Sequence, residues 1–128
     1  MRILLDTHVL LWAVLTPNQL SRSASMAVSD PVNAILVSAA SAWEIATKVR
    51  LGKLPGAVAL ERRFMDAIDD AGYGLLSIDV PTALRAGRLI GDHGDPFDRM
   101  IVAQALALDI PIVSSDTHLD SFGVRRIW

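Results

Sequence analysis

Short apolar runs recur along this chain at spacings that leave room for a helix between them, and this alternation restricts the fold more than any other feature. Each run is continuous, as in a strand that is buried on both faces of a sheet. The runs are Ile3–Leu5, Ala34–Val37, Leu75–Ile78 and Ile110–Ser114, and a terminal strand is expected at Val124–Trp128. Strands that alternate with helices predict a parallel sheet with helices on both faces. The expected fold is therefore α/β, a single-domain three-layer α/β/α sandwich with a mostly parallel central sheet.

Helices are expected in every interval between these strands, because apolar periodicity and capping residues fill the intervals. The expected helices are His8–Val14, Ser21–Ser29, Ala39–Leu51, Val58–Ala71, Thr82–Ile90 and Pro96–Leu108, with a helical turn at Thr117–Phe122. The segment Val58–Ala71 has the clearest amphipathic pattern and is predicted to be one helix. A length of 128 residues fits one domain, residues 1–128.

Composition limits the function classes that remain. The chain has no Cys, which excludes disulfides and thiolate metal sites and fits a cytoplasmic protein. No apolar run approaches the ~20 residues of a membrane span, so no membrane association is expected. With 12 basic and 14 acidic residues the net charge is −2, which disfavours a strongly basic nucleic-acid binder. An enzyme that holds phosphate through bound cations remains compatible with this charge.

The segment from His93 to Leu108 begins with a turn and two carboxylates and continues as an almost wholly apolar helix, which predicts a buried one. Asp95 is the expected N-cap and Pro96 the first helical residue. Asp98 lies in the first turn, where a carboxylate suits the helix dipole. The alternative is that Asp98 faces a pocket shared with other acids.

Further acids stand where parallel strands end. Asp6 follows the first strand and Asp116 the fourth, so both are expected at the same edge of the sheet, where ligand sites gather in open α/β folds. Glu44 and Asp98, on helices that leave this edge, can reach it. Purely structural roles remain open for two of these acids. Asp6 can serve only as a helix cap, and Glu44 can belong to a capping box with Ser41 or to a surface ion pair with Lys48.

Several segments resemble the PIN-domain ribonucleases, and specifically the VapC-like toxins of toxin–antitoxin pairs. The matching segments are Leu4–His8, Ser38–Ile45, His93–Ala105, Val113–Asp116 and the closing Ile127–Trp128. They occur in order over nearly the full length. The resemblance implies a PIN domain and a metal-dependent endoribonuclease that acts as a toxin.

The same resemblance implies that Asp6, Glu44, Asp98 and Asp116 are the catalytic and metal-binding acids, for Mg²⁺ or Mn²⁺. Ser114, Asp95 and Thr7 are expected beside them, with the role of Asp95 open between cap and catalysis. The implied partners are an RNA substrate, a cognate antitoxin protein and a second copy of the chain. Among the basic residues, Lys48, Arg50 and Lys53 are candidate RNA contacts, whereas His93 is interpreted as a structural turn residue.

Three rival functions were compared with this one. An aspartyl phosphatase usually has a second acid two residues after the first, but that position is His8. A signalling receiver domain needs a lysine after a late strand, and none is present. A catalytically silent PIN-like partner-binding module remains the alternative, because binding surfaces leave weak sequence signals.

Overall fold

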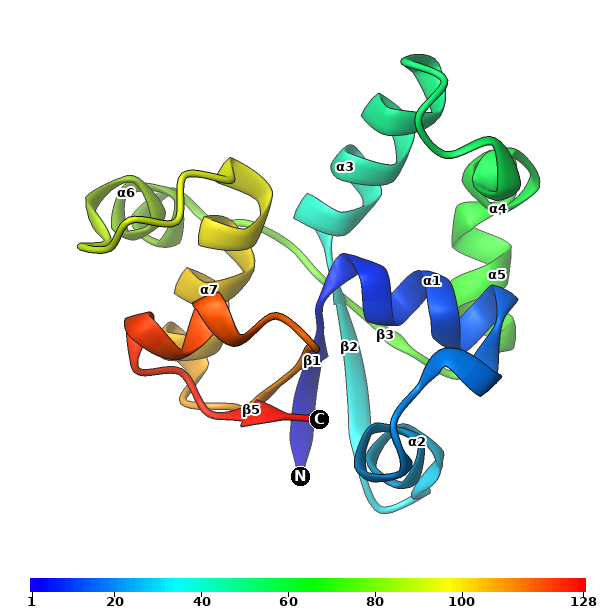
Figure 1. The fold of residues 1–128 in the computed structure, drawn as a ribbon, viewed down its shortest axis with the longest axis horizontal. Helices are drawn as coiled ribbons and strands as arrows, with labels where there is room; N and C mark the ends of the chain where they lie inside the picture. The colour runs from blue at the N-terminus through cyan, green and yellow to red at the C-terminus, as the bar shows by residue number, and fades with distance from the viewer.

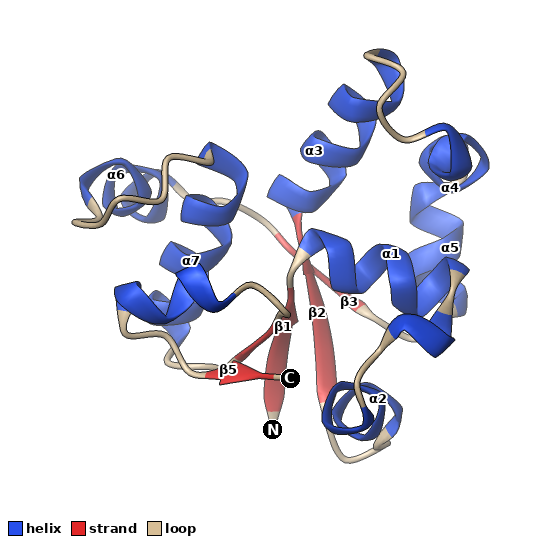
Figure 2. Ribbon diagram, in the orientation of Figure 1, coloured by secondary structure: helices blue, strands red, loops and turns tan.

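The computed structural model describes residues 1–128 as one five-stranded sheet with helices on both faces (Figure 1, Figure 2). The strands are β1 (Arg2–Leu5), β2 (Ala34–Ser38), β3 (Gly74–Leu76), β4 (Ile112–Val113) and β5 (Arg126–Ile127). Their order in the sheet is β3-β2-β1-β4-β5, and every neighbouring pair is parallel. The predicted three-layer α/β/α sandwich is confirmed.

The helices connect the strands as the alternation predicts. They are α1 (Thr7–Leu15), α2 (Arg22–Ser29), α3 (Ala39–Arg50), α4 (Val58–Arg62), α5 (Phe64–Asp70), α6 (Val80–Arg88) and α7 (Pro96–Leu108). Short 3₁₀ helices lie at Pro17–Gln19, Pro55–Ala57 and Thr117–Phe122. No helix combines the length and the apolarity that crossing a bilayer requires.

The strands are continuously apolar because each face of the sheet has its own core. Along β1, Ile3 and Leu5 pack into a core with α1, α2, α4 and α5, while Leu4 packs on the opposite face with α7. The same alternation occurs along β4, where Val113 and Ile112 belong to opposite cores. Because successive side chains point to opposite faces, two buried faces require apolar residues at every position.

One predicted element is wrong. The segment Val58–Ala71 is not a single helix, since it breaks at Arg63, where φ is −119° and ψ is 31°. Leu60 and Ile68, on either side of the break, are both buried in the same core. The backbone leaves helical geometry at Arg63, and the segment continues as two short helices that each bury one of these side chains. Periodicity alone could not show this adjustment.

Candidate functional site

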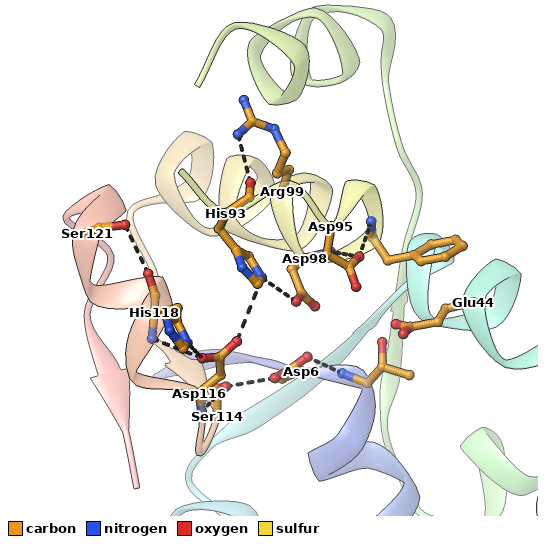
Figure 3. A network of polar contacts seen from close by, with 12 residues as sticks. Asp6, Glu44, His93, Asp95, Asp98, Arg99, Ser114, Asp116, His118 and Ser121 are labelled. Atoms are coloured by element: carbon orange, nitrogen blue, oxygen red, sulfur yellow. Dashed lines mark hydrogen bonds and ion pairs between the residues drawn. The ribbon is translucent and has the colours of Figure 1, made fainter. Parts of the chain in front are cut away.

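Asp6 and Asp116 lie at the carboxyl edge of the sheet, after β1 and β4, and Ser114 connects them (Figure 3). The Ser114 hydroxyl donates to Asp6 Oδ2 at 2.7 Å and accepts from the Asp116 backbone N–H at 3.0 Å. Asp6 Oδ1 accepts from the Thr7 backbone N–H at 2.7 Å, so Asp6 also caps α1. Asp6 is only 5% exposed, and these bonds fix its carboxylate in one orientation.

Glu44 reaches the same region from α3 and is 2% exposed (Figure 3). Its Oε2 pairs with Lys48, while its Oε1 is buried and has no hydrogen-bond partner. The capping-box reading of Glu44 is wrong, because α3 begins at Ala39 and Ser38 caps it by accepting from the Ala40 N–H. The ion pair with Lys48 exists, but its acid is buried rather than on the surface. An unpartnered buried carboxylate oxygen is costly, and it calls for an explanation.

The first turn of α7 supplies two acids with different surroundings. Asp95 Oδ1 accepts from the backbone N–H groups of Phe97 at 2.9 Å and Asp98 at 3.2 Å, which confirms its predicted N-cap role. Asp98 Oδ2 lies 2.7 Å from His93 Nε2, away from the cap. The two carboxylates of this turn therefore have separate partners.

His93 belongs to the site, and its interpretation as only a turn residue is wrong. Its Nε2 lies 3.7 Å from Asp116 Oδ2 as well as beside Asp98. One ligand atom each from His93, Asp98 and Asp116 falls within 4.8 Å of the others, a spacing that can hold a metal ion. His118 stacks on His93 with ring centroids 6.0 Å apart, and its Nδ1 lies 2.9 Å from Asp116 Oδ1. The only sequence feature that indicated a role for His93 was its type, since histidine is a common metal ligand and this one stands close to Asp95 and Asp98.

Arg99 holds the loop that carries His93. Its guanidinium donates to the backbone carbonyls of Ala86, Leu89 and His93. It also lies 5.8 Å from the centroid of the Phe122 ring. Although Arg99 follows Asp98 in the sequence, its hydrogen-bond partners are carbonyl oxygens and not carboxylates.

Burial and mutual repulsion perturb the titration of this cluster. Burial, together with the charges of Asp6, Asp95 and Glu44, raises the pKa of Asp98 to about 6, against the hydrogen bond with His93. Burial also raises the pKa of Asp6. The hydrogen bond to Asp98 raises the pKa of His93. Clustered carboxylates that are hard to ionise together are a common property of functional sites.

Asp116 differs from these buried acids. Burial acts to raise its pKa, but the hydrogen bonds from His118 outweigh this effect, so the pKa of Asp116 is lowered. The cluster therefore keeps one carboxylate readily charged beside two that resist ionisation.

Of the remaining residues that the sequence analysis names, some lie at the acidic edge of the sheet and others lie away from it. Lys48 lies beside Glu44, but Arg50 and Lys53 are exposed at the far end of α3 and in the loop after it, with no ion pair to an acid of the site. The Thr7 hydroxyl bonds to Ser41 at 2.9 Å, so only its backbone N–H contacts the acids. The structure thus places one of the three candidate RNA contacts at this edge.

The residues present fit a divalent cation. The carboxylates of Asp6, Glu44, Asp98 and Asp116 offer hard oxygen ligands, which Mg²⁺ and Mn²⁺ prefer. The buried Glu44 Oε1 without a partner is the group that a bound cation would satisfy. We call these four residues the acidic site.

Comparison with known proteins gives a family match and a shared fold. Residues 3–124 match the PIN domain family. Ribonuclease VapC16 of Mycobacterium tuberculosis is 48% identical over 52 residues, which cover 41% of this chain and 37% of that protein. The match therefore spans little more than a third of the relative's length.

Two solved structures resemble the whole chain. VapBC2 from Rickettsia felis, bound to a DNA fragment from their promoter, has a TM-score of 0.67 at 14% identity, covering 98% of this chain and 97% of that one. FitAcB from Neisseria gonorrhoeae has a TM-score of 0.66 at 20% identity, with coverage of 97% and 95%. At these identities the likeness establishes the fold.

Proposed function

The chain belongs to the PIN domain family, and from that premise we propose that residues 1–128 form one PIN domain that cleaves RNA phosphodiester bonds as a metal-dependent endoribonuclease. The observation that carries the proposal is the gathering of four acids from β1, α3, α7 and the end of β4, with one Glu44 oxygen buried and unpartnered. The 48% identical stretch of a protein named as a ribonuclease supports the choice of RNA.

Each residue of the acidic site has a defined part in this proposal. Asp6, Glu44, Asp98 and Asp116 would hold Mg²⁺ or Mn²⁺. When bound, such ions activate water and neutralise the charge that develops on a phosphodiester. Ser114 and the Thr7 N–H hold the Asp6 carboxylate in place, and Asp95 secures the helix start from which Asp98 projects.

Lys48 is the candidate phosphate contact nearest to these acids. Its Nζ is held by Glu44, and the charges of Glu44, Asp95 and Asp98 favour its charged form. If Glu44 held a cation, the Lys48 ammonium would be free to bind the substrate phosphate. Unpaired RNA is the expected substrate, because the bases of a duplex are hard to reach.

We further propose that the protein acts in the cytoplasm as a toxin, restrained by a cognate antitoxin protein and assembled as a homodimer. The resemblance to VapC-like toxins and the fold shared with VapBC2 support this role. Trp43 and Leu51 are exposed apolar side chains of the kind that interaction surfaces use, whereas Trp12 packs on Trp128.

The test is cleavage of a short unstructured RNA with Mg²⁺, with Mn²⁺ and with EDTA. Wild type is expected to cleave only with metal, and Glu44→Gln is expected to lose at least about a hundredfold of that activity. The matched control is Glu61→Gln, which alters a glutamate outside the acidic site. Calorimetric titration with Mn²⁺ gives a second readout, in which Glu44→Gln binds weakly and Glu61→Gln binds as wild type.

Other outcomes contradict the proposal in distinct ways. A folded wild type that binds no Mn²⁺ and cleaves no RNA would favour the partner-binding module. A phosphate group trapped on Asp6 would instead indicate a phosphatase.

A further inference from the structure

An apolar pocket lies beside the acidic site, between α3, α6 and α7. Its cavity volume is about 190 Å³, and its lining includes Ala40 and Trp43 of α3, Ala86 of α6, and Phe97 and Met100 of α7. Trp43 is 62% exposed although it packs edge-on against Phe97, with ring centroids 4.8 Å apart. Much of the indole is therefore open to a ligand.

The pocket and the acidic site share two helices at adjacent residues. Trp43 precedes Glu44 on α3, and Phe97 precedes Asp98 on α7. Consecutive helical residues point about 100° apart, so each helix presents an acid to one side and an aromatic ring to the other. A ligand bound at the acids has this pocket as its immediate neighbour.

Charge and size indicate what the pocket accepts. Its one charged lining residue, Arg99, has its guanidinium committed to backbone carbonyls, so the pocket offers no free cation for a phosphate. The volume is below the ~300 Å³ of a typical small-molecule site, but a cavity of ~150 Å³ already admits a benzene ring. One neutral, planar ring is the occupant that fits.

We propose that an unpaired nucleobase of the RNA substrate stacks on Trp43 and enters this pocket, while the neighbouring phosphodiester lies at the acidic site. This inference rests on the proposed function and adds to it a base-binding subsite that requires single-stranded RNA. Every base has a π face, so stacking supplies affinity without demanding one sequence. Continuity with the acidic site favours a base over a side chain of a partner protein.

The test uses an unstructured RNA whose cleavage site has been mapped with Mn²⁺, and versions with one abasic residue at each position around the cut. Wild type is expected to lose about tenfold in kcat/KM at one abasic position next to the cut. Trp43→Leu keeps an apolar side chain but no ring. It should lose about tenfold on intact RNA and nothing further at that abasic position.

Two variants serve as controls. Trp43→Phe keeps a ring and should retain most of the activity on intact RNA. Met26→Ala removes a side chain of α2 that is 64% exposed, and it should match wild type on every RNA. Melting temperatures establish that each variant is folded.

The outcomes separate this inference from the proposed function. Wild type that cleaves no RNA overturns both. Wild type that cleaves, while Trp43→Leu retains full activity and the same abasic sensitivity, overturns the subsite alone. If Trp43→Leu leaves cleavage unchanged but weakens self-association in sedimentation, the pocket is a protein interface instead.

Discussion

Two aspartates three residues apart at the start of α7 have different roles. Asp95 is the N-cap and accepts hydrogen bonds from two backbone N–H groups, whereas Asp98 faces His93 and the other acids. Asp95→Ala should therefore lower the free energy of unfolding by about 1 kcal/mol, the usual contribution of a cap, and retain most RNA cleavage well below its melting temperature. Urea denaturation and cleavage rates, measured on the same preparation, check this expectation.

Asp98→Asn should behave in the opposite way. Removing the charge of this partly buried carboxylate relieves its repulsion with the neighbouring acids. The change should raise the melting temperature of the metal-free protein, while Mn²⁺ binding and cleavage fall sharply. Thermal melts in EDTA and Mn²⁺ titrations measure the two effects. Normal cleavage by Asp98→Asn would remove Asp98 from the mechanism, and a stable but inactive Asp95→Ala would show that the two roles are reversed.

Lys48 competes with a cation for Glu44. Lys48→Met should strengthen Mn²⁺ binding in the absence of RNA by roughly two- to tenfold, because the ammonium no longer neutralises Glu44. In the same variant, RNA binding should weaken and its salt dependence should flatten by about one phosphate contact. Unchanged Mn²⁺ affinity, measured by calorimetry, would mean that the cation does not use Glu44.

The positions of these residues were predictable to different degrees. Asp6 and Asp116 follow apolar strands, and parallel strands end at one edge, so their proximity follows from the sequence pattern. His93 was not predictable in this way, because its contact with Asp98 and Asp116 depends on the path of an irregular loop. That path is set by hydrogen bonds of Arg99 to backbone carbonyls, which no sequence pattern encodes.

Arg99 joins α7 to the end of α6 and to the loop that carries His93. Arg99→Lys keeps the charge but cannot reach three carbonyls at once, because it lacks the planar fork of the guanidinium. We expect a loss of about 2–3 kcal/mol in unfolding free energy and faster amide exchange over residues 89–94. Arg88→Lys, which changes an exposed arginine of α6, is the matched control. Equal stability of the two variants would show that the hydrogen bonds of the Arg99 guanidinium do not stabilise the fold.

Element boundaries show where local sequence determines structure. The starts of α3, α6 and α7 follow the capping residues Ser38, Asp79 and Asp95, whose side chains accept hydrogen bonds from helix N–H groups. The cap at Asp95 was predicted, whereas α6 begins at Val80, two residues before the predicted Thr82. The break between α4 and α5 has no such local signal, since Arg63 is an ordinary helix former. Leu60 and Ile68, on either side of the break, are buried in the same core, and apolar periodicity does not distinguish this arrangement from one continuous helix.

For the whole molecule, the acidic site is a source of instability that metal can remove. Asp6 is buried and Asp98 is partly buried, both have raised pKa values, and the pKa of Asp98 is about 6. A raised carboxyl pKa contributes stability below its unfolded value near 3.8, and this contribution is lost as the pH rises through the folded value. The raised pKa of His93 acts in the same direction, because its stabilising protonation is also lost as the pH rises.

The metal-free protein should therefore lose part of its stability between about pH 4 and pH 7, and Mg²⁺ or Mn²⁺ should restore it at the upper end. At a hundred times the dissociation constant, a ligand stabilises the folded state by about 2.7 kcal/mol. For a chain of this length that corresponds to a rise in melting temperature of roughly 10 °C.

At pH 5 the rise should be much smaller, because protons compete with the cation for Asp98. Melting curves with EDTA and with Mn²⁺ at both pH values make the comparison, and Asp98→Asn should flatten the dependence on pH. A metal-induced rise that is equal at pH 5 and pH 7 would show that the cation binds elsewhere.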